Sequence, residues 1–245
     1  MGRLRIDKLL VERGLAGSRE RAQALILAGR VLVNEQKILK AGAAVDANAA
    51  IRLMGEELRY VGRGGLKLEG ALEHWQVDLT GKSCMDVGAS TGGFTDCMLQ
   101  HGAAKVVAVD TGYGQIDARL RNDSRVRLME RTNARYLSED QVPEKIEFVA
   151  MDVSFISATL VLPNVLRAAF KGAPGRFVVL VKPQFEVGRE HVGKGGIVRD
   201  EAEQRRAVEK VQTMVTELKA RRTEVIESPI TGAEGNREFL LYAEF

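Results

Sequence analysis

The sequence predicts an α/β protein in which a mostly parallel sheet, covered by helices on both faces, follows a small α+β module. Beyond about residue 60, seven short apolar runs alternate with helical stretches, and this alternation is typical of βαβ units. Before residue 60, apolar residues first follow a helical period and then form short strand-like runs. The 245 residues are enough for one large and one small domain.

The basic residues are concentrated at the start of the chain. Lys and Arg number 36 and Asp and Glu 33, which gives a formal net charge of +3. Residues 1–40 hold nine basic and four acidic residues, so this segment carries +5 and the remainder −2. The composition, 45% hydrophobic and 28% charged residues, is that of an ordinary globular protein and excludes a disordered one.

The first module is expected to contain two helices and a small sheet. Apolar residues at helical spacing predict a helix from Ile6 that stops at Gly14. Ser18 caps a second helix, which ends at Gly29. A strand, a turn and a closing strand are then expected at residues 31–33, 34–37 and 51–53.

A linker separates this module from the rest of the chain. Residues 54–65 include the run Gly62-Arg63-Gly64-Gly65, which we expect to be flexible. We therefore divide the chain into a first domain at residues 1–60 and a second at residues 61–245.

The second domain is expected to start with a helix, at residues 66–72, and to continue as alternating strands and helices. The predicted strands are residues 83–87, 105–109, 125–129, 146–151, 176–181, 223–226 and 239–243. The predicted helices among them are residues 94–101, 158–169 and 201–221. The last two strands are too close for a helical crossover, so we expect them to form an antiparallel hairpin on the sheet.

The first strand of this domain ends in a glycine-rich turn that leads into a helix. The segment 86–95 reads DVGASTGGFT, and open parallel sheets bind ligands at such turns. Asp86 disfavours a pyrophosphate at this turn, because two negative charges would face each other. Asp110 lies 24 residues after Asp86, close to the spacing of about 20 residues at which an acidic side chain binds the ribose of a nucleotide. A ligand with an ammonium group for Asp86 and a ribose for Asp110 would suit this turn. S-adenosylmethionine carries both groups, so the sequence indicates this cofactor. The alternative is a tight turn with Asp86 as a helix cap.

Charged residues also stand at the ends of three later strands. Asp152 and Lys182 each follow a run of apolar residues, and Glu238 precedes the last strand. A charge next to a buried strand is costly unless it is paired. We expect Asp152 and Lys182 to meet at one edge of the sheet, and Glu238 to reach that edge if its strand is antiparallel. A structural ion pair is the alternative to a catalytic one.

These segments resemble the TlyA family, in which an S4-type RNA-binding domain precedes an FtsJ-like methyltransferase domain. The S4 resemblance covers residues 5–14, 18–22, 28–31 and 33–34. The methyltransferase resemblance covers residues 63–68, 86–94, 152–155, 182–186, 193–200 and 235–239. Nearly the whole chain is covered, with the motifs in the family's order. One departure is Gly62, where the family more often has Ser.

The resemblance implies a Rossmann-like, seven-stranded, S-adenosylmethionine-dependent methyltransferase domain that acts on a ribose 2′-hydroxyl of ribosomal RNA. The residues that match its catalytic tetrad are Lys67, Asp152, Lys182 and Glu238. The residues that we assign to cofactor binding are Asp86, Gly88, Ser90, Thr91, Gly92, Gly93, Phe94, Asp110 and Asn133. For Asn133, an exposed turn with a cap is the alternative.

The tetrad suits the chemistry of a ribose hydroxyl, which is a weak acid and a weak nucleophile. A lysine serves as a base when burial or a neighbouring cation favours its neutral form. We assign Lys182 as the base, with Lys67 as the neighbouring cation. Asp152 and Glu238 then hold the lysines and the hydroxyl in place.

The basic module is expected to bind RNA phosphates, with a solvated surface as the alternative. Its candidate RNA-binding residues are Arg3, Arg5, Lys8, Arg19, Arg21 and Arg30. The resemblance implies a cytidine of ribosomal RNA as the target. Shorter members of the family modify the large-subunit site alone, and this chain begins close to the first S4 helix, so we favour large-subunit rRNA, with the small subunit possible.

Other features narrow the remaining alternatives. Cys84 and Cys97 do not have the spacing of a metal site, and they predict reduced thiols in a cytoplasmic protein. We expect no metal and no membrane span.

The glycine-rich loop 188–199 is either a flap over RNA or a long solvated connection, and we favour the flap. Two other functions stay open: a catalytically inactive ribosome-binding factor and, from the family's other name, a haemolysin. The oligomeric state is not predicted.

Overall fold

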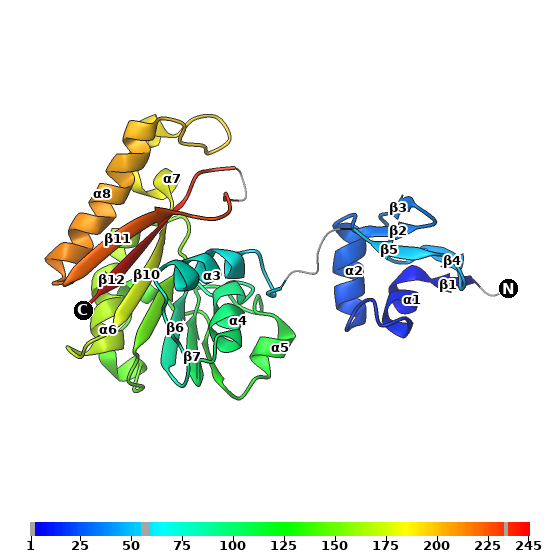
Figure 1. Ribbon diagram of the computed structural model, residues 1–245, viewed down its shortest axis with the longest axis horizontal. Helices are drawn as coiled ribbons and strands as arrows, with labels where there is room; N and C mark the ends of the chain where they lie inside the picture. The colour runs from blue at the N-terminus through cyan, green and yellow to red at the C-terminus, as the bar shows by residue number, and fades with distance from the viewer. Residues whose placement is uncertain (1–2, 55–58, 233–234) are drawn as a thin grey trace. The chain divides into compact units, whose positions relative to one another are not determined.

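Residues 3–54, 59–232 and 235–245 are described by the computed structural model. Residues 55–58 of the predicted linker lie outside this description. The chain divides into two compact units, Met1–Glu57 and Leu58–Phe245 (Figure 1).

The first unit contains two helices, α1 (Ile6–Glu12) and α2 (Arg19–Leu27). As predicted, the Ser18 hydroxyl caps α2 by accepting the Arg21 N–H, and Gly14 and Gly29 have positive φ where the helices end. The strands are β1 (Arg3–Arg5), β2 (Val31–Val33), β3 (Gln36–Ile38), β4 (Ala44–Asp46) and β5 (Ile51–Leu53). β1 pairs with β4, and β2 lies between β3 and β5.

Three of these strands escaped the sequence analysis. β1, β3 and β4 have three residues each, and their mixed exposure gives no apolar run. The turn expected at residues 34–37 is shorter than predicted, because Asn34 and Glu35 alone adopt left-handed backbone and β3 begins at Gln36.

The second unit is built on a seven-stranded sheet in the order β11-β12-β10-β9-β6-β7-β8. The strands are β6 (Ser83–Val87), β7 (Lys105–Val109), β8 (Val126–Met129), β9 (Phe148–Met151), β10 (Arg176–Val181), β11 (Arg222–Glu227) and β12 (Phe239–Glu244). β6 to β10 are parallel, and β12 runs antiparallel to both β10 and β11. The seven predicted strands and the predicted hairpin are therefore present.

Helices cover both faces of this sheet (Figure 1). One face carries α3 (Gly64–His74), α4 (Gly93–Gln100) and α5 (Ala118–Arg121), and the other carries α6 (Leu162–Phe170) and α8 (Glu201–Glu217). The short helices are α7 (Pro183–Glu186), η1 (Ala134–Tyr136), η2 (Glu139–Gln141), η3 (Ala158–Leu160) and η4 (Arg189–His191). Because side chains alternate along a strand, Cys84 of β6 joins one core and Met85 the other.

The glycine run before α3 is only partly as predicted. Gly64 and Gly65 form the first turn of α3 rather than a flexible link. A Cβ on Gly65 would overlap the ring of Tyr60, which is buried beside it. Close packing of Tyr60 therefore explains this glycine better than chain flexibility does.

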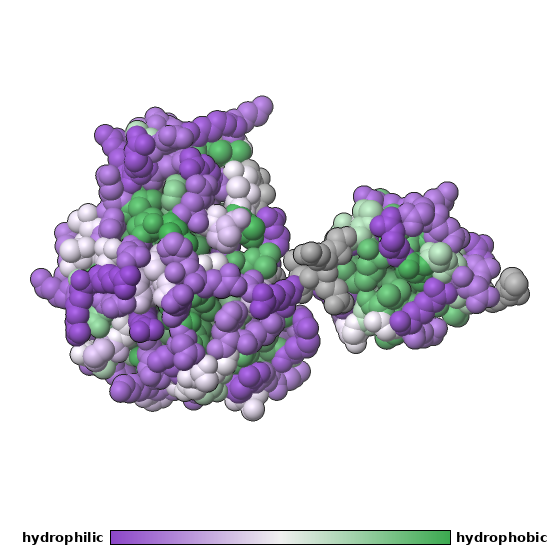
Figure 2. All heavy atoms as spheres, viewed as in Figure 1, coloured by the Kyte–Doolittle hydropathy of each residue, from purple (hydrophilic) through white to green (hydrophobic). Residues whose placement is uncertain are grey.

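Hydrophilic residues dominate the visible surface of the second unit (Figure 2). Among the helices of the described residues, none combines the length and the apolarity needed to cross a membrane.

Candidate active site

The glycine turn after β6 packs against the loop that follows β9. Gly88 has a φ of +88°, and a Cβ there would overlap the backbone carbonyl of Asp152. Gly92, with a φ of +96°, precedes α4, and a Cβ there would overlap Leu120. Glycine at position 88 thus lets the turn approach the Asp152 loop at the carboxyl edge of the sheet, and glycine at position 92 lets it pack against Leu120.

Asp86 lies beneath this turn and has no accessible surface. Its Oδ2 accepts a 2.6 Å hydrogen bond from the Thr95 hydroxyl of α4, whereas its Oδ1 has no hydrogen-bond partner among the described residues. Burial raises the pKa of Asp86 to about 7, and the nearby Asp152 and Asp110 add to the rise. Asp86 therefore holds the Thr95 side chain at the start of α4, whose N-cap residue is Gly92. Its second oxygen favours a positive charge in the turn above it.

Asp110 follows β7 and borders the same turn. Its two carboxylate oxygens accept the Ser90 N–H at 2.7 Å and the Gly112 N–H at 2.6 Å. Each oxygen retains a second lone pair. The backbone thus fixes the carboxylate while leaving it able to accept hydrogen bonds from two hydroxyl groups.

Three of the residues assigned to cofactor binding, Phe94, Gly93 and Asn133, contribute to packing or to helix capping. Phe94 is 3% exposed and belongs to the core between the sheet, α3 and α4. Gly93 permits close contact between helices, because a Cβ there would lie 3.0 Å from the backbone nitrogen of Gly65. Asn133 caps η1, the alternative we considered for it. Ser90 and Thr91, in contrast, are exposed beside Asp110.

Two of the tetrad residues form an ion pair at the ends of neighbouring strands. Lys182 Nζ lies 2.5 Å from Asp152 Oδ1, which is the pairing predicted from the sequence. The contact is electrostatic rather than a well-aligned hydrogen bond, since this buried oxygen accepts none from the described residues. The Lys182 side chain is 11% exposed and the Asp152 side chain 21%, so both remain reachable from solvent.

The other two tetrad residues form a more deeply buried pair. The ammonium of Lys67, from α3, contacts the carboxylate of Glu238, and both side chains are at most 10% exposed. The sheet register brings this pair next to the first, because Val181 of β10 pairs with Phe239 of β12 and the adjoining residues are Lys182 and Glu238. All four predicted tetrad residues thus converge at one edge.

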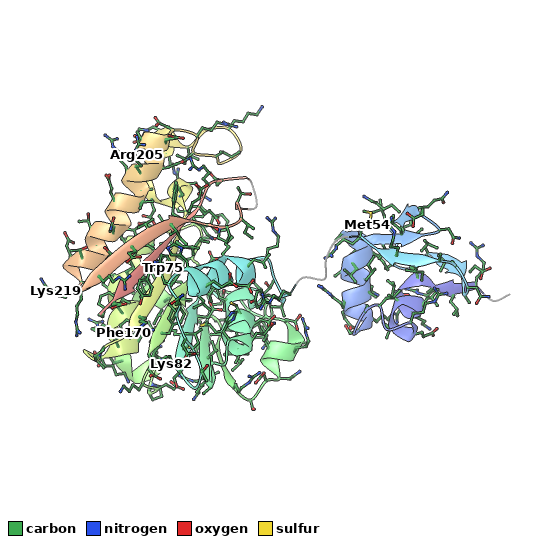
Figure 3. All side chains as sticks on the ribbon, viewed as in Figure 1. Met54, Trp75, Lys82, Phe170, Arg205 and Lys219 are labelled. Carbon is green, nitrogen blue, oxygen red and sulfur yellow. The ribbon has the colours of Figure 1, made fainter. Side chains whose placement is uncertain are left out.

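Trp75 anchors the helix that carries Lys67. Its indole N–H donates a 2.9 Å hydrogen bond to Glu224 of β11, and its ring stacks on Tyr242 of β12 with a centroid distance of 5.1 Å. Figure 3 labels Trp75 at the end of α3. The end of α3 is thereby fixed to the two strands that flank Glu238. Lys82 and Phe170, labelled in the same figure, precede β6 and β10 and mark the opposite edge of the sheet.

Sequence reasoning missed the side chains that border Lys182. Lys182 Nζ donates a 2.7 Å hydrogen bond to the Ser154 hydroxyl. The next residue, Phe155, has a left-handed φ of +64° and is 92% exposed, with its ring centroid 5.3 Å from that of Phe185. An apolar residue next to a strand end looks like a core residue in the sequence, so only the backbone geometry reveals this exposed aromatic side chain.

The loop at residues 188–199 is attached to the tetrad region at one end. The buried Asn236, two residues before Glu238, accepts the Val198 N–H at 3.1 Å and donates to the Gly196 carbonyl at 2.9 Å. Residues 193–196 are mostly exposed. The second half of the loop is therefore tied to the segment before β12 that contains Asn236 and Glu238.

The basic residues of the first unit differ in their surroundings. Arg5 and Arg19 both pair with the buried Asp7, at 2.8 and 2.9 Å, and these contacts hold the pKa of that carboxyl well below its usual range. Lys8 and Arg21 form no ion pair with any residue in the described part of the chain. Arg5 and Arg19 therefore have a structural role, and their RNA-binding role stays a prediction.

No group of three or more His, Cys, Asp or Glu residues suited to a metal ion occurs within the described ranges. The two cysteines are buried and unbridged. The candidate site thus consists of a glycine turn, a carboxylate with free lone pairs and two lysine–carboxylate pairs at one sheet edge.

The chain is similar to known proteins over nearly its whole length. Residues 4–51 match the S4 domain and residues 60–245 match the FtsJ-like methyltransferase family. The 16S/23S rRNA (cytidine-2′-O)-methyltransferase TlyA of Mycobacterium tuberculosis is 44% identical over 98% of this chain and 89% of its own length.

Two further relatives carry different names. The 23S rRNA (cytidine-2′-O)-methyltransferase TlyA of Campylobacter jejuni is 34% identical over 75% of this chain and 70% of its own. A solved structure named as a hemolysin of Streptococcus thermophilus is 42% identical, with a TM-score of 0.74, and covers 100% of this chain and 89% of that one. The chain therefore belongs to the TlyA family, in which an S4 domain precedes an FtsJ-like methyltransferase domain.

Proposed function

We propose that this protein transfers a methyl group from S-adenosylmethionine to the ribose 2′-hydroxyl of a cytidine in ribosomal RNA. The observation that carries the proposal is the convergence of Lys67–Glu238 and Lys182–Asp152 beside the glycine turn. The two relatives named as cytidine-2′-O-methyltransferases support the nucleotide and the kind of RNA.

The residues around the glycine turn suit S-adenosylmethionine, which supplies a methyl group made electrophilic by its sulfonium. Asp110 accepts the ribose hydroxyls with the lone pairs that its backbone contacts leave free. Ser90, whose N–H binds Asp110, and the next residue, Thr91, are both exposed. The buried Asp86 favours the positive charges of the ligand.

Lys182 takes the proton in the proposed reaction. Lys182 first releases a proton from its ammonium group to solvent. A bond then forms between the 2′-oxygen and the methyl carbon, the bond from that carbon to sulfur breaks, and the hydroxyl proton passes to the neutral Lys182 Nζ. Lys182 belongs to the more exposed pair, since the Asp152 side chain is 21% exposed and that of Glu238 4%, and Asp152 stabilises the ammonium that results. The buried Lys67–Glu238 pair fixes the position of the hydroxyl, since in-line alignment supplies much of the rate.

Phe155 is placed to hold the target nucleotide. Its exposed ring follows the Asp152 loop and contacts Phe185 of the segment after Lys182. A base stacked on an aromatic side chain gains about 1–3 kcal/mol. We infer that the cytidine base rests on this ring while its ribose meets Lys182.

Large-subunit rRNA is the favoured substrate. It is the one substrate that the names of the two cytidine-2′-O-methyltransferase relatives share, since one reads 16S/23S and the other 23S.

The choice of substrate is tested by incubating the protein and S-adenosylmethionine with isolated ribosomal subunits and mapping ribose methylation on each subunit. Methylation of the small subunit alone contradicts the choice of substrate. Cofactor binding without transfer to either subunit favours the inactive ribosome-binding factor, and vesicle leakage favours the haemolysin.

Cofactor affinity should depend on pH through Asp86. Because its folded-state pKa is raised to about 7, Asp86 is protonated at pH 6, and a cationic ligand binds better after the proton leaves. Affinity should therefore rise by up to about tenfold per pH unit below pH 7 and level off above it. Calorimetric titration at pH 5.5–7.5 in two buffers of different ionisation enthalpy measures the proton release. Asp86→Asn should abolish the dependence; the same slope in that variant contradicts the role of Asp86.

RNA binding should depend on Lys8 and Arg21. Reversing both, Lys8→Glu with Arg21→Glu, should weaken rRNA binding and reduce the slope of log affinity against log salt by about 1.5–2, because each phosphate contact releases counterions. These two residues leave Asp7 and its partners intact. Lys145→Glu with Lys171→Glu, which alters exposed residues before β9 and β10, is the matched control. Equal salt slopes for the two double variants contradict an electrostatic role of the first unit.

A further inference from the structure

The Ser154 hydroxyl and the buried Glu186 form an arrangement around Lys182 that the tetrad does not include. Within the described part of the chain, Lys182 Nζ contacts two polar side-chain atoms, Asp152 Oδ1 at 2.5 Å and Ser154 Oγ at 2.7 Å. Ser154 is exposed, so the side of the lysine that it borders faces the solvent where a substrate arrives.

We propose that Ser154 is a positioning residue that aims the lone pair of Lys182 at the substrate hydroxyl, and that Glu186 holds Ser154 in place. This proposal rests on the proposed role of Lys182 as the base. A neutral lysine amine has two N–H bonds and one lone pair. With one N–H bond donated to Ser154, and with the lone pair repelled by the Asp152 carboxylate 2.5 Å from Nζ, the lone pair takes the one remaining staggered direction. Without Ser154 the amine rotates about its last carbon bond, and the lone pair loses its direction.

Glu186 fixes the loop that carries Ser154. One of its oxygens accepts the Ala158 N–H at 2.6 Å, and the other accepts the Ser157 hydroxyl at 2.5 Å and lies 3.2 Å from Lys210 Nζ. The Glu186 side chain is 2% exposed. A carboxylate this deeply buried needs such partners, so the loop cannot shift without leaving Glu186 unsatisfied.

The same network holds both ends of the Ser154–Lys182 contact. Glu186 ends α7, whose N-cap is Lys182, and its partners Ser157 and Ala158 follow Ser154 along the chain. Lys210 of α8 adds a 2.9 Å hydrogen bond to the Glu186 carbonyl. The left-handed turn at Phe155, unfavourable for a bulky residue, is thereby held between Asp152 and the Glu186 contacts.

The test compares the steady-state kinetics of methyl transfer to ribosomal subunits among single variants. Ser154→Ala should lower kcat about 10- to 100-fold while the Kd for S-adenosylmethionine and the Tm stay within error, because Ser154 is exposed. Ser154→Thr, which keeps the hydroxyl, should restore most of kcat. Glu186→Gln should lower kcat in the same way, since its amide N–H2 would face a donor in either orientation, the Ala158 N–H or the Lys210 ammonium.

Glu144→Gln is the matched control, because Glu144 is another carboxylate held in ion pairs, with Lys105 and Arg127, but it precedes β9 and is not part of the tetrad. Its kcat should equal that of the unaltered protein. If Ser154→Ala retains kcat within twofold, or if Ser154→Thr is as slow as Ser154→Ala, the positioning role is overturned while the proposed function stands. If the unaltered protein binds the cofactor but transfers no methyl group, the proposed function fails and this inference fails with it.

Discussion

Lys182→Ala is expected to lower kcat for methyl transfer about 1,000-fold, within the range of 10²–10⁴ that a positioned general base contributes. The alanine leaves the 2′-hydroxyl with no group to receive its proton, while the glycine turn and Asp110 are untouched. The Kd for S-adenosylmethionine should therefore stay within about twofold. Single-turnover kinetics with ribosomal subunits, together with calorimetric titration of the cofactor, measure the two quantities.

The variant Lys182→Arg distinguishes a general base from a residue that acts only through its positive charge. The guanidinium keeps the positive charge beside Asp152 but does not give up a proton at neutral pH. It should lose nearly as much rate as the alanine. A Lys182→Arg variant with near-normal kcat would show that Lys182 acts only through its charge, and a Lys182→Ala variant with more than a tenth of the normal kcat would remove it as the base.

Lys67→Met is expected to destabilise the second unit by about 3–5 kcal/mol, as found when one partner of a buried ion pair is removed. The change leaves the carboxylate of Glu238, 4% exposed, without the ammonium that compensates its burial. Methyl transfer should be lost as well. Urea unfolding, followed by the fluorescence of Trp75, which lies in the same unit, measures the loss of stability.

The double variant Lys67→Met, Glu238→Leu separates stability from catalysis. Replacing a buried ion pair by apolar residues of similar volume is often neutral or stabilising. Most of the stability should therefore return, whereas methyl transfer should not. If Lys67→Met is as stable as the unaltered protein, or if the double variant regains activity, the account of this inner pair is wrong.

The sheet edge was predictable because it depends on regular patterns. Apolar runs located the strands, and the short connection before β12 indicated an antiparallel hairpin. Antiparallel pairing of β12 with β10 brings the positions of Lys182 and Glu238 opposite each other. The Asp152–Lys182 pairing followed from the cost of an unpaired charge beside a buried strand.

Side-chain environments were less predictable, because they depend on tertiary packing. The sequence places Asp86 and Phe94 in one glycine-rich motif, yet the structure buries both beneath the turn. Arg5 and Arg19 belong to one basic cluster, but a buried Asp7 engages them. The environments of Glu186 and Phe155 could not be predicted from the sequence. Glu186 is buried and Phe155 is exposed, and both go against the usual preference of their residue types.

The most direct test of the account is the identity of the methylated nucleoside. The protein is incubated with ribosomal subunits and S-adenosylmethionine labelled in its methyl group, and the rRNA is digested to nucleosides and separated. The account predicts that the label appears in 2′-O-methylcytidine and that Lys182→Ala removes it. Label in a base-methylated nucleoside, or an unlabelled rRNA despite bound cofactor, would contradict the proposal that the paired lysines and carboxylates act on a ribose hydroxyl.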